Sequence, residues 1–145
     1  SSIASFLADV DRDTDAFNRV MDAMRLPKKT DADKAARDEA IEEATKEATR
    51  VPLDVLRRTR EAAECARIVT EQGNRNSISD SGVAALAART AAEGAYLNVL
   101  INLSGIQDEV FCEETRKEAE TVRQEVVLHT EETVRLTEKL MREET

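Results

Sequence analysis

Apolar residues recur every three to four positions along most of the chain, which is the spacing of one face of an α-helix. The pattern falls into four segments, separated by residues that stop helices. No segment alternates apolar and polar residues at every second position, the pattern that indicates a strand. The sequence therefore predicts an all-α protein, a bundle of long helices in a single domain over residues 1–145.

The first helical segment runs from about Ile3 to Met24. It ends at Leu26, because a residue that precedes proline avoids the helical conformation and Pro27 follows. The apolar face predicted for this helix consists of Ile3, Phe6, Leu7, Val10, Phe17, Val20, Met21 and Met24.

The second segment begins after Thr30 and reaches roughly residue 71. Thr30 and Asp33 have the spacing of a capping box, in which two side chains bond the first free backbone groups of a helix. Pro52 lies inside the segment, where it removes one backbone hydrogen bond and crowds the carbonyl of Ala48. We therefore expect a kink or short break near residues 50–51, and Gly73 as the C-cap.

The third segment starts near Ser79 or Asp80, ends near Leu103, and is rich in Ala, Gly and Thr. Near its end, Asn98 and Asn102 interrupt an apolar run. Residues four apart lie on the same helical face, and buried amides are costly unless they are hydrogen-bonded. We expect both amides to bond either another helix or a polar ligand.

The fourth segment spans about Asp108 to Arg142. Its apolar and small residues alternate spacings of four and three, a heptad seam suited to a neighbouring helix or a second subunit. His129 belongs to this seam, so we interpret it as a packed, hydrogen-bonded residue. The predicted seam consists of Thr115, Ala119, Val122, Val126, His129, Thr133, Leu136 and Leu140.

Composition agrees with long helices, because charged residues make up 35% of the chain and aromatic residues only 3%. The net charge of −9 argues against a nucleic-acid partner, which needs clustered basic side chains. No apolar run is long enough to cross a bilayer and no leader opens the chain, so we expect no membrane partner and a cytoplasmic protein. Two cysteines and one histidine do not complete a zinc site, so no metal is expected.

Three stretches of the sequence hold recognisable motifs. The first begins DRDTDAFN and covers residues 11–28, and the second reads ATKEATRVPL at residues 44–53. The third includes residues 73–74 and 79–80 and ends GAYLNVLINL at residues 94–103. Taken together, in this order and at these separations, they resemble the cyclodeaminase/cyclohydrolase family of folate enzymes. The resemblance covers nearly the whole chain.

The resemblance implies a helical homodimer whose folate site lies in a groove between subunits. Cyclodeaminases close 5-formiminotetrahydrofolate to 5,10-methenyltetrahydrofolate and release ammonia, and this is the activity expected first. Cyclohydrolase-type members hydrate the methenyl compound to 10-formyltetrahydrofolate, which is the alternative. A third hypothesis is that the chain is a noncatalytic helical dimerisation module. No cofactor is expected beyond the tetrahydrofolate substrate.

The resemblance also implies site residues. Asp13 matches the family's catalytic aspartate and could take a proton from one nitrogen and return it to another; without the family match it is a solvated acid in a charge run. Lys28 could bind the glutamate tail of folate or serve only as a favourable charge after a helix. Asn98 and Asn102 could bond the pterin ring, with bonding between helices as the alternative. Asp80, which the family shares, is either a ligand contact or a helix cap.

The beginning of the sequence departs from the family pattern. Family members start with a helical segment that holds a Pro-Gly-Gly-Gly-Ser-like turn, whereas this sequence starts after that point, at Ser1. The expectation is either a truncated sequence or a site that has lost one part. No formiminotransferase domain accompanies the helices, so the chain is not expected to be the complete bifunctional enzyme.

Overall fold

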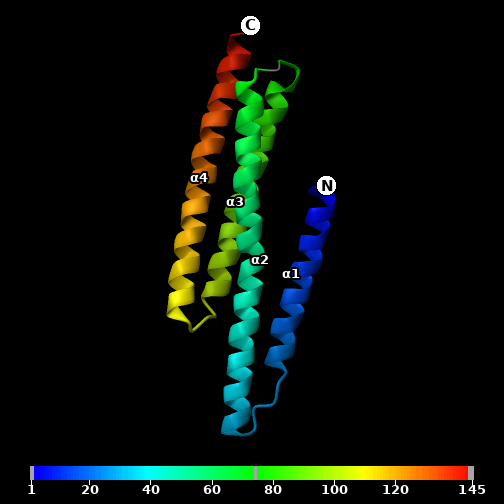
Figure 1. The fold of residues 1–145 in the computed structure, drawn as a ribbon, viewed down its shortest axis with the longest axis vertical. Coiled ribbons are helices and arrows are strands. Elements are labelled where there is room, and N and C mark those ends of the chain that lie inside the picture. Colours follow the sequence, from blue (N-terminus) through cyan, green and yellow to red (C-terminus); the bar gives the residue numbers. More distant parts are fainter. Residues whose placement is uncertain (1, 74, 144–145) are drawn as a thin grey trace. The chain divides into compact units, whose positions relative to one another are not determined.

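The computed structural model describes the backbone of residues 2–73 and 75–143 and the side chains of residues 11–73 and 76–143. Four α-helices account for almost all of the described residues, and no strand occurs among them (Figure 1). The all-α prediction is therefore confirmed. The elements are α1 (Ser2–Met24), α2 (Asp31–Glu71), the short 3₁₀ helix η1 (Arg75–Ser77), α3 (Ile78–Leu103) and α4 (Glu109–Arg142). No described helix is long and apolar enough to span a membrane.

The ends of α2 are capped by the residues that the sequence predicted. The Thr30 backbone N–H donates to Asp33 Oδ2 at 3.1 Å, and the Asp33 N–H donates to Thr30 Oγ1 at 3.0 Å, which confirms the capping box. At the other end of α2, Gly73 has a φ of 64°, the left-handed conformation that glycine adopts most cheaply.

Helix α2 is continuous across Pro52, so the expected break near residues 50–51 is not found. Pro52 has no N–H to donate to the carbonyl of Ala48, four residues earlier. The side chain of Asn102, on α3, fills this place, because its Nδ2 donates to Ala48 O at 3.3 Å. An amide on a neighbouring helix thus replaces the hydrogen bond that proline removes.

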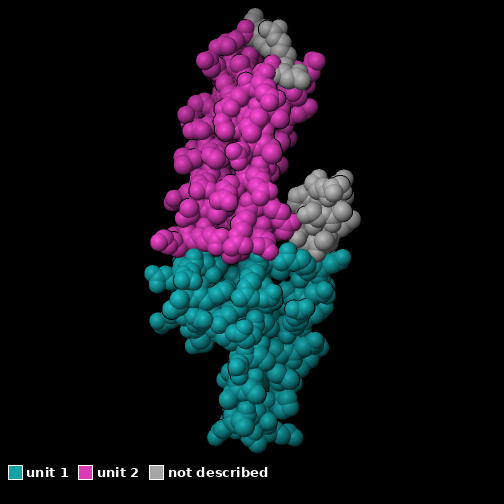
Figure 2. All heavy atoms as spheres, viewed as in Figure 1, with its two compact units in different colours: residues 1–52, 98–116 teal, residues 53–97, 117–145 magenta. Residues whose placement is uncertain are grey.

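The chain divides into two compact units (Figure 2). Unit 1 comprises residues 1–52 and 98–116, and so contains α1, the first part of α2, the end of α3 and the start of α4. Unit 2 comprises residues 53–97 and 117–145, with the remaining parts of α2, α3 and α4.

In unit 1, α1 buries its smallest apolar residues rather than its largest. Ala16 and Ala23 are 7% exposed, whereas Phe17 is 61% and Met24 is 47% exposed. The predicted apolar face is therefore wrong at Phe17 and Met24. Alanine side chains allow a closer approach of two helix backbones than phenylalanine or methionine do. The remaining members Ile3, Phe6, Leu7 and Val10 lie outside the described side chains.

In unit 2, the buried seam of α4 departs from the prediction after Val126. Thr133 is buried as predicted, whereas His129, Leu136 and Leu140 are only half-buried. Thr130 and Thr137 are buried in place of their neighbours His129 and Leu136. The hydroxyls of Thr130, Thr133 and Thr137 each donate to the carbonyl four residues earlier, at 2.7–2.9 Å, so these buried polar groups are paired. The buried residues of α4 in this unit are Ala119, Val122, Val126, Thr130, Thr133 and Thr137.

Close approach of α3 to α4 explains why a small threonine replaces leucine at the end of this seam. A Cβ atom built on Gly82 would lie 2.9 Å from Thr137 Cγ2, a distance at which one of the two must move. No larger side chain fits at either position without separating the helices.

Candidate functional site

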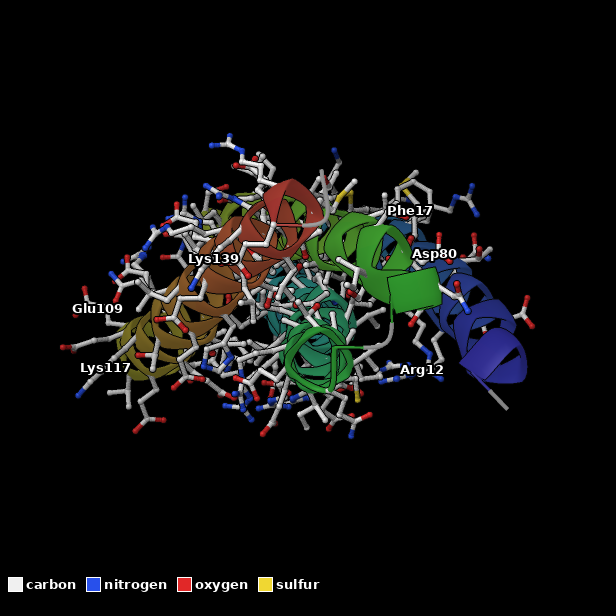
Figure 3. The ribbon with its side chains drawn as sticks, turned by 90° about the horizontal axis from the view of Figure 1, so that it is seen from above. Arg12, Phe17, Asp80, Glu109, Lys117 and Lys139 are labelled. Carbon is white, nitrogen blue, oxygen red and sulfur yellow. The ribbon has the colours of Figure 1, made fainter. Side chains whose placement is uncertain are left out.

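Asp13 lies on α1 in unit 1, and its side chain is exposed. It has no hydrogen bond or ion pair with any residue that the structure describes. Phe17 follows one turn later, and residues four apart lie on the same side of a helix. This surface therefore presents an unpaired carboxylate beside an exposed aromatic ring. Figure 3 shows Phe17 and Arg12 on different sides of α1.

Lys28 lies in the connection between α1 and α2, and its side chain is exposed, as is that of Lys29. The favourable charge at the end of α1 comes instead from Arg37, whose Nε donates to Met24 O at 3.1 Å. Nearby, Arg25 pairs with Asp22 at 3.3 Å. Lys28 has no such partner among the described residues, so its ammonium group remains available to a ligand.

The two asparagines of α3 differ in their surroundings. Asn102 is half-buried and bonds Ala48 O, which corresponds to the alternative of bonding between helices. Asn98 is exposed and bonds no described residue. Of the pair, only Asn98 has its whole amide free for a ligand.

A polar cluster at the start of α4 was not foreseen from the sequence. The carboxylate of Glu42, on α2, accepts hydrogen bonds from the backbone N–H groups of Gln107 and Asp108 at 2.9–3.0 Å. Asp108 in turn accepts from the Phe111 N–H at 3.0 Å and pairs with Lys46 at 2.9 Å. These contacts hold the α3–α4 connection against α2. The only local signal in the sequence was Asp108 at the N-cap of a helix, because Glu42 and Lys46 lie more than 60 residues away from it.

The charges of this cluster stabilise one another. The backbone hydrogen bond from Phe111, followed by the bond from Lys46, lowers the pKa of Asp108. The bond to Asp108 raises the pKa of Lys46. Burial raises the pKa of the neighbouring Cys112 thiol, so this cysteine stays protonated and is an unreactive thiol.

Asp80 lies in the first turn of α3 and belongs to unit 2. Its side chain is exposed, whereas the next residue, Ser81, is buried and forms a 2.7 Å hydrogen bond with Thr70. A carboxylate in the first turn of a helix is favoured by the helix dipole whether or not it binds a ligand. Asp13, Lys28, Asn98 and Asn102 all belong to unit 1.

Tyr96 is held by other side chains of unit 2. The guanidinium of Arg123 lies 5.0 Å from the centre of its ring, and Arg123 also makes two hydrogen bonds to Glu93, at 2.6 and 3.2 Å. Tyr96 thus packs beneath an ion pair. His129 is half-buried, and its Nδ1 has no hydrogen-bond partner within the described residues, contrary to the bonded histidine that was predicted.

Helix α3 exposes a broad apolar face in addition to its buried one. Val83, Leu86, Leu97 and Ile101 are 51–68% exposed, although alanines on the other side of the same helix are buried. Gly94 lies on this exposed face, and no atom lies within 4 Å of the position of its missing Cβ. A helix that is apolar on all sides is normally covered on all sides.

Each unit contains a hollow lined by described residues. In unit 1, a hollow of about 160 Å³ lies between α1 and α2 and is lined by Arg12, Asp15, Ala16, Arg19, Glu47 and Val51. In unit 2, a hollow of about 270 Å³ between α3 and α4 is lined by Leu86, Arg89, Thr130, Glu131, Val134, Arg135 and Glu138. Across the described residues, no three His, Cys, Asp or Glu side chains gather into a cluster that could hold a metal ion.

These features define an all-helical protein whose candidate site residues lie on helices α1 and α3 and on the connection after α1. Residues 1–121 match the sequence model of the formiminotransferase-cyclodeaminase family. The chain belongs to this family.

Relatives within the family carry two different names. The chain is 48% identical over 119 residues to a methenyltetrahydrofolate cyclohydrolase of Methylorubrum extorquens. This alignment covers 82% of this chain and 56% of that protein. It is 37% identical over 116 residues to the formimidoyltransferase-cyclodeaminase of Rattus norvegicus. That alignment covers 80% of this chain and 21% of the rat protein. The chain thus spans about half of the bacterial relative and about a fifth of the rat protein.

A solved structure shares the fold. The formiminotetrahydrofolate cyclodeaminase of Thermotoga maritima superimposes with a TM-score of 0.79 at 28% identity, over 92% of this chain and 63% of that one. The fold of this chain is therefore similar to that of the Thermotoga cyclodeaminase.

Proposed function

We propose that the protein acts on a one-carbon derivative of tetrahydrofolate, and that it hydrates 5,10-methenyltetrahydrofolate to 10-formyltetrahydrofolate. The observation that carries the reaction class is the family match over residues 1–121. Hydration is placed before the cyclodeamination expected from the sequence, because the cyclohydrolase relative is 48% identical and the two cyclodeaminase relatives are 37% and 28% identical.

Asp13 is the residue proposed to transfer protons. In hydration, its carboxylate accepts a proton from the water that attacks the methenyl carbon, and returns it to N5 as the bond from that carbon to N5 breaks. The remaining hydroxyl proton leaves to solvent as the formyl C=O bond forms, so one proton is released for each cation hydrated. In the alternative cyclodeamination, it accepts the proton of N10 as N10 attacks the formimino carbon, and gives it to the departing ammonia. In both cases a carboxylate beside the cationic methenyl group also stabilises that cation. The exposed state of Asp13 supports this role, since it has no ion pair with a described residue that would have to be broken.

Three further residues are proposed to bind the substrate. Lys28 would pair with a carboxylate of the glutamate tail, and Asn98 would bond the edge of the pterin ring. Asp80 is proposed on family similarity alone. Asn102, which already bonds Ala48, is proposed to position the end of α3 rather than to contact the pterin directly.

We also propose that two copies of the chain associate through the exposed face of α3. Four large apolar side chains and the open surface at Gly94 support this, because a glycine without neighbours leaves room for another backbone.

The assay uses full-length protein with 5,10-methenyltetrahydrofolate and, separately, with 5-formiminotetrahydrofolate. Loss of methenyl absorbance above the uncatalysed rate supports hydration, whereas gain of methenyl absorbance with release of ammonia supports cyclodeamination. The variant Asp13→Asn should fold normally and lose about 10²- to 10⁴-fold in kcat, the usual contribution of a general base. Asp22→Asn, an exposed aspartate of the same helix, is the matched control.

Turnover by Asp13→Asn at the rate of the natural protein would remove Asp13 from the mechanism. Absence of turnover with both substrates would leave the noncatalytic module as the better reading. Thermal stabilisation by a folate then decides between a binding protein and a pure scaffold, because only a protein that binds the ligand is stabilised by it.

A further inference from the structure

The feature of α1 that its packing does not explain is the outward position of Phe17. Its phenyl ring is 61% exposed, although Ala16, beside it in the sequence, is 7% exposed and faces the core. Exposing a phenylalanine forgoes the burial of a large apolar side chain, so an exposed ring marks a contact more often than an exposed small residue does. Met24, 47% exposed, lies two turns further along the same side of α1.

Phe17 lies next to the proposed reaction centre. Asp13 is one turn away on the same side of α1, and four residues of helix advance about 6 Å along the axis. A p-aminobenzoyl ring is bonded directly to N10 of a folate, and the methenyl carbon joins N10 to N5. A methenyl group held against Asp13 therefore brings an aromatic ring, and a delocalised cation, within reach of Phe17.

We infer that the Phe17 ring is a binding surface for the one-carbon end of the substrate: it stacks on the p-aminobenzoyl ring and lies against the cationic N5–C–N10 group. This inference rests on the proposed function. The negative face of an aromatic ring attracts cations, and two aromatic rings attract one another in offset-stacked or edge-to-face arrangements. Phe17 would thus favour the cationic methenyl compound over neutral tetrahydrofolate, while Asp13 moves the proton.

The surroundings of Phe17 suit a small ligand. Asp13 and Asn18 are both exposed beside it, so the ring is flanked by polar side chains that can bond a heterocycle. The exposed face of α3 is different, because there four large apolar residues share one side of a helix. That arrangement fits a second copy of the chain, whereas a single ring beside a carboxylate fits a folate.

The test compares Phe17→Leu with Phe17→Tyr in the full-length protein. Leucine keeps the apolar volume but removes the ring, and tyrosine keeps the ring. Dissociation constants are measured for 5,10-methenyltetrahydrofolate and for tetrahydrofolate, together with kcat, KM and the assembly state by sedimentation. Leu128→Ala, which alters a 59% exposed side chain of α4, is the control for loss of exposed apolar surface.

Phe17→Leu is expected to weaken binding of the methenyl cation by about tenfold and of neutral tetrahydrofolate by about threefold, with Phe17→Tyr close to the natural protein. Equal affinities in the natural protein and Phe17→Leu would overturn the inference. So would a change of assembly state in ligand-free Phe17→Leu, because Phe17 would then belong to a protein interface. If the natural protein itself binds no folate, the proposed function fails first, and this result is distinct from the other two.

Discussion

At the scale of single residues, Asn102 and Pro52 depend on one another across two helices. Pro52 leaves the carbonyl of Ala48 without its helical donor, and Asn102 supplies a donor at 3.3 Å. Both residues lie in stretches through which the sequence resembles its family. Their joint presence therefore has a structural cause, in addition to any contact that Asn102 makes with a ligand.

This pairing predicts a specific mutational coupling. Asn102→Ala should lower the free energy of unfolding by about 1–3 kcal/mol, since it leaves a part-buried carbonyl unsatisfied. In a Pro52→Ala background the restored backbone N–H bonds Ala48 O, and Asn102→Ala should cost less. Urea unfolding of the four proteins in this double-mutant cycle measures the difference. Equal costs in both backgrounds would mean that the Asn102 bond does not compensate for proline.

At the scale of elements, the helix ends were predictable and the buried faces only in part, since five of the eight predicted seam residues of α4 are buried whereas Phe17 and Met24 of α1 are exposed. Thr30, Asp33 and Gly73 are local signals, because each acts on a backbone group a few residues away. The faces of α1 and α4 depend on how closely a neighbouring helix approaches. Where two helices approach closely, alanine on α1 and threonine on α4 are buried instead of the larger residues that hydrophobicity favours. The distance between two helices cannot be predicted from a single sequence.

Two glycines within α3 offer a matched test of this close approach. Gly82→Ala should lower stability by about 1–3 kcal/mol, because its new Cβ would lie 2.9 Å from Thr137 Cγ2. Gly94→Ala meets open space and should be neutral or stabilising by up to about 1 kcal/mol, since alanine favours a helix. Chemical unfolding at one protein concentration compares them. A Gly82→Ala variant as stable as Gly94→Ala would show that α4 adjusts its position freely.

At the scale of the whole molecule, the candidate site was predictable only in part. The resemblance to the family indicated Asp13, Lys28 and the α3 asparagines as candidate site residues, and the structure describes the surroundings of each. The exposed Phe17 ring was missed, because its spacing fits the apolar face of α1 as well as the buried alanines do. The contact of Glu42 with the start of α4 was missed as well, since it joins residues far apart in sequence.

Association through α3 predicts a charge-sensitive assembly. Leu97 is 63% exposed in the single chain, so Leu97→Glu should leave its fold intact and should prevent two copies from pairing, because a buried unpaired carboxylate is very costly. Leu128→Glu, at 59% exposure on α4, is the control. Sedimentation equilibrium measures the mass of both. A dimer of unchanged stability in Leu97→Glu would place the interface on another surface.

The alanine packing of α1 has a consequence for how the proposed site forms. Two small side chains, Ala16 and Ala23, bury little apolar surface, so the free energy that holds this part of α1 to α2 is small. Segments with few buried apolar contacts are the ones that open first while the rest of a protein stays folded. Asp13 and Phe17 thus lie on a weakly held part of α1, and a ligand that contacts both would use part of its binding free energy to hold that part against α2.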